Sequence, residues 1–224
     1  MAALRDHENN LDAVARVIRA CVDVLPVDGA SISVMTGTQE REMLFASDDV
    51  AAQIEALQFS LGEGPCFEAF TTRRPVLVPD LPQASASAWP VFATAIEELP
   101  VGAIFAFPLQ TGAITIGAID LYRTRPGWLS GDELTAALEV VDLATVVLLG
   151  LQLGDVAGDG WWGALSSNRE QVHQATGMLI AAMGVSAEEG LARLRGYAFV
   201  MGRSVDEVAH DVVTRQLSPF ELDR

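Results

Sequence analysis

The sequence predicts an α+β protein, with an antiparallel sheet flanked by helices and a small bundle of three helices behind it. Half of the 224 residues are hydrophobic, which is enough to form a folded core. Up to about residue 153, segments that are rich in β-branched residues and have the two-residue period of strands occur between segments with helical periodicity. Beyond a Gly-rich stretch at 154–166, only helical periodicity follows, so the chain divides into a domain at 1–153, a linker and a domain at 167–224.

The first domain begins with an amphipathic helix over 9–25, because its apolar residues recur at helical spacing. Residues 30–36 and 42–47 alternate apolar and polar side chains and are separated by a Gly turn, which predicts two paired strands. Asp48 is then a predicted N-cap for a helix over 49–58.

Five further elements follow: a helix at 65–72, a strand at 76–79, a helix near 89–98, a hairpin that turns at 111–112 and a helix at 131–153. A Gly-rich loop precedes the first of them, and Ser130 or Asp132 caps the last. The pattern predicts a five-stranded antiparallel-type sheet. We expect the first and last helices of the domain to cover one face, and the short helices and loops to cover the other and leave a pocket.

Three short helices are predicted in the second domain from their start and stop signals. Gly184 ends the first helix, Ser186 caps the second, Gly202 ends it and Ser204 caps the third. Acidic residues follow both serines, as the helix dipole favours. The predicted buried stripe of the middle helix is Ala187, Leu191, Leu194, Ala198 and Met201.

Charge and cysteine content limit the class of function. The net charge is −16, and every basic residue is Arg. Residues 1–166 hold 8 Arg and 22 acidic residues, whereas 167–224 hold 6 Arg and 8 acidic residues, so the second domain is nearly neutral. Neither part is a basic patch, which weighs against unspecific binding of polyanions. Cys21 and Cys66 form no disulfide framework, the histidines are scattered, and no metal site is expected. With no signal peptide and no membrane span in the sequence, we expect a cytoplasmic protein.

The segments "LGEGPCFEAFTTRRPVLVPDL" and "FPLQTGAITIGAIDLYRTRPGWLSGDE" resemble a GAF domain, a module that senses small molecules and other signals. The resemblance covers about residues 8–153. It implies a ligand pocket of unknown specificity, for which the candidate residues are Cys66, Phe67, Phe105, Phe107, Asp120 and Tyr122. Aromatic residues on strands are also common in cores, which is the alternative for the phenylalanines and the tyrosine.

The tail segments "QATGML", "GVSAEEGLARLRGYA" and "RSVDEVAHDVV" resemble an ANTAR domain in the same helix order. ANTAR proteins bind RNA, typically paired hairpin loops in nascent transcripts, and thereby block a terminator. The candidate RNA-binding residues are Arg169, His173, Gln174, Thr176, Gly177, Arg193, Arg195, Tyr197, Arg203 and Ser204. The family usually has Lys where this chain has Thr176, so one phosphate contact is lost.

Each of these candidates has a structural alternative. Gly177 either lets two helices pack closely or lets RNA approach the backbone. Arg193, Arg195 and Arg203 either contact phosphates and unpaired bases or pair with neighbouring acidic residues on the surface. Tyr197 either stacks on a base or packs inside the bundle.

The combined prediction is a non-enzymatic antiterminator, a homodimer whose GAF domain controls RNA binding by the tail in response to a small molecule or a protein. The alternative is a protein-interaction sensor whose tail serves for dimerisation or docking. Enzymatic reduction of methionine sulfoxide at Cys66 is a third possibility, but that chemistry needs a resolving thiol, and Cys21 is expected to lie far away. No cofactor and no membrane partner are expected.

Overall fold

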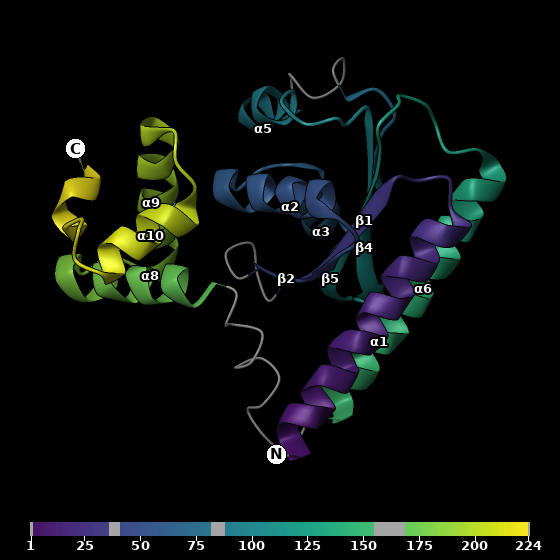
Figure 1. Cartoon of the computed structure of the whole chain (residues 1–224), viewed down its shortest axis with the longest axis horizontal. Coiled ribbons are helices and arrows are strands. Elements are labelled where there is room, and N and C mark those ends of the chain that lie inside the picture. Colours follow the sequence, from purple (N-terminus) through teal and green to yellow (C-terminus); the bar gives the residue numbers. More distant parts are fainter. Residues whose placement is uncertain (1, 36–40, 82–87, 155–168, 224) are drawn as a thin grey trace. The chain divides into compact units, whose positions relative to one another are not determined.

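The computed structural model describes the following residues of the chain: 2–35, 41–81, 88–154 and 169–223. They form two compact units, one mainly from the first 165 residues and one mainly from 166–224 (Figure 1). Most of the predicted linker at 154–166 lies outside the described residues. Within the described part, no helix is both long and apolar enough to cross a membrane.

The first unit is built on a five-stranded sheet with the strand order β2-β1-β5-β4-β3. All neighbouring strands are antiparallel. The strands are β1 (Gly29–Met35), β2 (Arg41–Ala46), β3 (Val76–Val78), β4 (Ala103–Thr111) and β5 (Ile114–Arg123). Gly117 on β5 permits the close approach of the neighbouring strand β1, because a Cβ there would lie 2.1 Å from the carbonyl oxygen of Ser33.

Helices cover both faces of this sheet. They are α1 (Ala2–Val24), α2 (Asp49–Leu61), α3 (Pro65–Thr72), α5 (Pro90–Ile96) and α6 (Gly131–Gly154). The long helices α1 and α6 lie side by side on one face, and α2 and α3 lie on the other (Figure 1). The main hydrophobic core lies under α1 and α6, as expected for the first and last helices of the unit.

The predicted caps of the first unit are present. Asp48 Oδ1 accepts hydrogen bonds from the N–H groups of Val50 and Ala51 at the start of α2. Of the two candidates for the cap of α6, the structure selects Ser130, whose hydroxyl accepts from the N–H of Glu133. The Glu133 carboxylate accepts from the Ser130 N–H in return, which completes a capping box.

The second unit contains α8 (Glu170–Met183), α9 (Ala187–Met201), α10 (Val205–Val213) and a short 3₁₀ helix η2 (Pro219–Asp223). Gly184 and Gly202 end α8 and α9 in the left-handed conformation, and Ser186 and Ser204 cap α9 and α10, as predicted. The predicted stripe of α9 is wrong at both ends. Ala187 and Met201 are exposed, and Gly190 joins Leu191, Leu194 and Ala198 in the interior.

Candidate functional site

Five polar side chains meet between the sheet and helices α2 and α3 of the first unit. They are Arg41 from β2, Glu55 and Gln58 from α2, Cys66 from the first turn of α3 and Asp120 from β5. None of them is more than 5% exposed. Ion pairs and hydrogen bonds join them into one network, which we name the buried polar cluster.

Arg41 and Gln58 connect the members of the buried polar cluster. Arg41 forms an ion pair with Glu55, and its Nη2 lies 3.9 Å from Asp120 Oδ2. Gln58 Nε2 donates to Asp120 Oδ2 at 2.6 Å, and Gln58 Oε1 accepts from the N–H of Cys66 at 2.8 Å. Gln58 therefore fixes both the carboxylate on β5 and the first turn of α3.

The Gly-rich loop before α3 is explained by these contacts. Gly64 has φ 136°, and a Cβ there would lie 2.6 Å from Gln58 Oε1, so a side chain would displace the amide. Glu63 Oε1 accepts from the N–H groups of Val91 and Phe92 at the start of α5. The loop thus joins α2, α3 and α5, and Glu63 occupies a structural position.

Burial has the largest effect on the pKa values of Asp120 and Cys66 in this cluster. It raises the pKa of Asp120 above its usual value, although the Arg41 charge and the hydrogen bond from Gln58 act in the opposite direction. Burial also raises the pKa of Cys66 to about 12, so this residue is a thiol at neutral pH. The Arg41 guanidinium lies 4.9 Å from the centroid of the Phe67 ring, a cation–π contact that offsets part of its desolvation.

Three of the six predicted pocket residues, Cys66, Phe67 and Asp120, lie in or against the buried polar cluster. Phe105 and Phe107 do not, because they point to the opposite face of the sheet and are completely buried in the core under α1 and α6. The structure therefore corrects the assignment of these two residues, since side chains on a strand alternate between faces.

Tyr122 lies on the same face of the sheet as Asp120, because side chains two positions apart on a strand point to the same side. Its hydroxyl donates to Asp48 Oδ1 at 3.1 Å, so it supports the cap of α2 rather than the cluster. Its burial and the neighbouring Asp48 charge raise its pKa.

Sequence reasoning missed Arg41, Glu55 and Gln58. A signal for two of them was present, because Glu55 and Gln58 occupy the same helical stripe as Ile54 and Phe59, which are buried. Polar residues on the buried stripe of an amphipathic helix indicate a partner inside the protein. Arg41 gave no comparable signal, since an Arg at the start of a strand is usually exposed.

The two cysteines lie in different cores, both as free thiols. Cys21 is part of the core under α1 and α6, whereas Cys66 packs with Met35 and Ala118 on the other face of the sheet. Burial raises the pKa of each thiol to about 12. Neither is a reactive thiolate, and Cys21 is not placed to resolve a sulfenic acid on Cys66.

In the second unit, one face of α8 is exposed, and beyond Glu170 in the first turn it has no acidic residue. It consists of His173, Gln174, Gly177, Ile180 and Ala181, and we name it the α8 stripe. Among the described residues, a Cβ on Gly177 would meet no atom within 4 Å, which argues against the alternative that Gly177 lets two helices pack closely. That role belongs to Gly190, whose added Cβ would lie 3.3 Å from Thr176 Cγ2.

Two of the predicted arginines pair with acidic residues of the same unit. Arg193 Nη2 donates to Glu189 at 2.6 Å, and Arg203 Nη1 donates to Asp211 at 2.8 Å. Arg203 is held mainly through this hydrogen bond, which raises its pKa. Both side chains remain partly exposed, and their acidic partners weaken the attraction that each Arg exerts on an anionic ligand.

The remaining candidates differ in exposure. Arg169 precedes α8 and is 8% exposed, which leaves it without a surface for RNA. Thr176 is half-buried, and its hydroxyl donates to a backbone carbonyl one turn earlier in α8. Arg195 and Tyr197 are half-buried on α9, and Ser204 is the exposed cap of α10.

Comparison with known proteins gives the same division of the chain. A family model described as the GAF domain matches residues 10–149, and one described as the ANTAR domain matches residues 164–213. No curated protein matches the chain.

Among solved structures, a GAF domain region from Geobacter sulfurreducens PCA has a TM-score of 0.53 at 12% identity, over 66% of this chain and 98% of that one. A GAF domain/HD domain protein from Geobacter sulfurreducens has a TM-score of 0.50 at 16% identity, over 64% of this chain and 94% of that one. A type II free methionine-R-sulfoxide reductase from Thermoplasma acidophilum has a TM-score of 0.48 at 13% identity. That match covers 65% of this chain and 96% of the reductase chain. At these identities the likeness shows the fold alone.

Proposed function

The chain belongs to the GAF domain family and has an ANTAR domain behind its GAF domain, and from this we propose that it is a cytoplasmic transcription antiterminator that binds RNA. The ANTAR domain would bind paired hairpin loops in a nascent transcript. The GAF domain would control this binding in response to a small molecule or a protein signal.

The α8 stripe is the observation that best supports RNA binding. The protein is strongly acidic, yet beyond Glu170 in the first turn this helix face has no carboxylate, and Gly177 leaves its backbone open to a ligand. His173 and Gln174 offer exposed groups that can form hydrogen bonds with bases or phosphates. RNA loops present unstacked bases and backbone to such a surface.

A non-enzymatic role for the GAF domain is supported by the state of its thiols. Cys66 and Cys21 are buried in different cores and protonated at neutral pH. The buried polar cluster instead offers groups that can bind a ligand and alter the packing of α2 and α3 on the sheet.

A homodimer is part of the proposal, because two tails held together would bind two hairpins at a high effective concentration. Helix α6 supports it with exposed apolar side chains on its outer face. Leu138 is 42% exposed, Leu143 is 55% exposed and Val146 is 66% exposed.

The test is a gel shift, at low and at physiological salt, with an RNA that contains two short hairpins, each with a loop of about six nucleotides. The same RNA with both loops scrambled is the control. We expect loop-dependent binding that weakens as salt rises, since contacts to phosphates release counterions. Binding that does not depend on the loop sequence would contradict the proposal. So would a result in which neither the full chain nor residues 155–224 alone bind the RNA.

A second candidate function is protein docking through the end of α9. Three consecutive apolar residues, Phe199, Val200 and Met201, are exposed there by 60%, 79% and 53%. A protein partner would cover such a patch. If RNA does not bind, this candidate becomes the better explanation of the ANTAR domain.

A further inference from the structure

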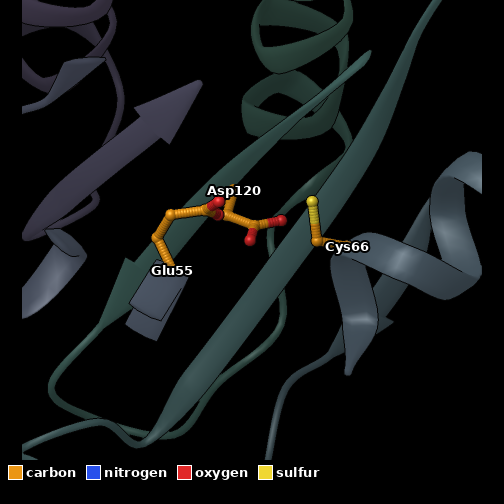
Figure 2. Close-up of side chains that lie close together, drawn as sticks. All are labelled: Glu55, Cys66 and Asp120. Atoms are coloured by element: carbon orange, nitrogen blue, oxygen red, sulfur yellow. The ribbon is translucent and has the colours of Figure 1, made fainter. Parts of the chain in front are cut away.

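Glu55, Cys66 and Asp120 of the buried polar cluster form a group with the geometry of a metal site. One carboxylate oxygen from each acid and the Cys66 sulfur all lie within 4.8 Å of one another. The three side chains reach this point from α2, from α3 and from β5, and all three are buried (Figure 2). The spacing of the sequence could not reveal this group, because each residue comes from a different element.

Each carboxylate has one oxygen engaged and one oxygen without a partner. Glu55 Oε2 pairs with Arg41, and Asp120 Oδ2 accepts from Gln58. Among the described residues, no N–H or hydroxyl donor reaches Glu55 Oε1 or Asp120 Oδ1, although both atoms are buried, and the Cys66 thiol lies within hydrogen-bonding reach of the Asp120 carboxylate. Buried carboxylate oxygens without a partner are rare in native proteins and indicate an ion or a water molecule.

We propose that Glu55, Cys66 and Asp120 bind one divalent first-row transition-metal ion. A thiolate together with carboxylates suits such ions, whereas Mg²⁺ and Ca²⁺ require oxygen ligands throughout. The charges of the ligands and of Arg41 are also compatible with a divalent ion. Once Cys66 has lost its proton on metal binding, three anionic ligands beside the Arg41 guanidinium carry two net negative charges, which one divalent ion neutralises.

Arg41 and Gln58 are the positioning residues of this site. Arg41 holds the second oxygen of Glu55, and Gln58 holds the second oxygen of Asp120 as well as the N–H of Cys66. Outer partners of this kind orient metal ligands and increase affinity. On binding, the metal–sulfur bond replaces the S–H bond of Cys66 and the proton leaves to solvent, with no change in oxidation state.

Three protein ligands leave a coordination position for a water or a small molecule. The ion would therefore be the signal itself or the means of binding one. This purpose rests on the sensing role proposed above, but metal binding is measured without RNA, so the two proposals can fail separately.

The experiment uses the full chain, reduced and freed of metal with a chelator, and titrated with Co²⁺ under anaerobic conditions. Because the site is buried, each addition is left to equilibrate. We expect a sulfur-to-cobalt charge-transfer band in the near ultraviolet that saturates at one ion per chain and disappears when Zn²⁺ displaces Co²⁺. Zn²⁺ should also raise the melting temperature.

The variant Cys21→Ser identifies the ligand without disturbing the site, because Cys66 is then the only thiol in the chain. It should retain the full band, and Cys66→Ser should lose it. Gln58→Ala should keep the band but bind Co²⁺ roughly 10- to 100-fold more weakly, as expected for an outer partner of the ligands.

Absence of the band in the wild-type chain overturns the proposal, and so does its loss in Cys21→Ser. If Cys66→Ser does not fold, Cys21→Ser still decides the result, because its band can come only from Cys66. A band in a folded Cys66→Ser variant would place the ion elsewhere and overturn the proposal as well.

Discussion

Two glycines of the ANTAR domain show how one residue type serves two purposes. Gly190 is buried between α8 and α9, where a Cβ would press on the methyl group of Thr176. Gly177 lies on the exposed α8 stripe, with open space where its side chain would be. Glycine in a helix costs about 1 kcal/mol relative to alanine. At Gly177 no contact with the described part of the chain explains that cost.

The substitution Gly177→Ala should therefore stabilise the ANTAR domain by up to about 1 kcal/mol, because no described residue opposes the new methyl group. If RNA approaches the backbone at this point, the same methyl group should weaken RNA binding. A loss of roughly tenfold would correspond to about 1.4 kcal/mol. Urea unfolding and the gel shift described above measure the two effects.

The matched control is Gly196→Ala on α9, which is also exposed and also has open space around its Cβ position. It should stabilise the domain similarly without the loss of RNA affinity. Equal RNA binding by Gly177→Ala and the wild-type chain would exclude the α8 stripe as the contact surface.

Residues of the candidate site could be predicted from sequence only where a motif or a strand end marked them. Cys66 was found through its position in the GAF resemblance, and Asp120 as a polar residue near the end of a predicted strand. Glu55 and Gln58 were missed although their place on the buried stripe of α2 was a signal, and Arg41 gave no signal because its partners, Glu55 and Asp120, lie elsewhere in the chain. Such partnerships depend on tertiary packing, which local periodicity does not contain.

Secondary elements were predicted well because their boundaries are encoded locally. Asp48, Ser186 and Ser204 each cap a helix with a side-chain oxygen, and Gly184 and Gly202 each end one at positive φ. The faces of the elements were harder to predict. Phe105 and Phe107 are equally compatible with either side of β4 until the positions of α1 and α6 are known.

The capping box of α10 gives a prediction for pH dependence. Hydrogen bonds from the backbone N–H and the hydroxyl of Ser204 lower the pKa of Glu207 below its usual 4.5. A lowered folded pKa means that the stabilisation is present above the unfolded pKa and is lost as pH falls through the folded value. The ANTAR domain should therefore lose stability as pH falls below about 4.5.

Glu207→Gln keeps a hydrogen-bond acceptor at this position but cannot titrate, so its stability should fall less over the same range. Ser204→Ala should cost about 1 kcal/mol at neutral pH through loss of the cap. Urea unfolding of the three proteins, between neutral pH and about pH 3, measures both effects. Parallel pH profiles for the wild-type chain and Glu207→Gln would show that this box does not contribute.

At the scale of the whole molecule, the proposed dimer gives a test that involves neither RNA nor metal. Val146→Glu places a charge on the outer face of α6, where a second copy would bury it without a partner. We expect sedimentation to show a dimer for the wild-type chain and a monomer for the variant.

Ile114→Glu is the matched control for the dimer, because Ile114 is 62% exposed, close to the 66% of Val146, but starts β5 at the hairpin turn. It should remain a dimer. A monomeric wild-type chain, or a dimeric Val146→Glu variant, would remove α6 from the interface.

The alternation of β5 has a mechanical consequence. Asp120 points into the buried polar cluster, while its neighbours Ile119 and Leu121 point into the core under α1 and α6. A strand hydrogen-bonded on both sides moves as a stiff unit, and a close-packed interior does not absorb small shifts. We therefore expect a displacement of Asp120 to shift the core beneath α6, the helix that precedes the segment leading to the ANTAR domain. The sheet therefore has the buried polar cluster on one face and the core beneath α6 on the other, separated by a single layer of strands.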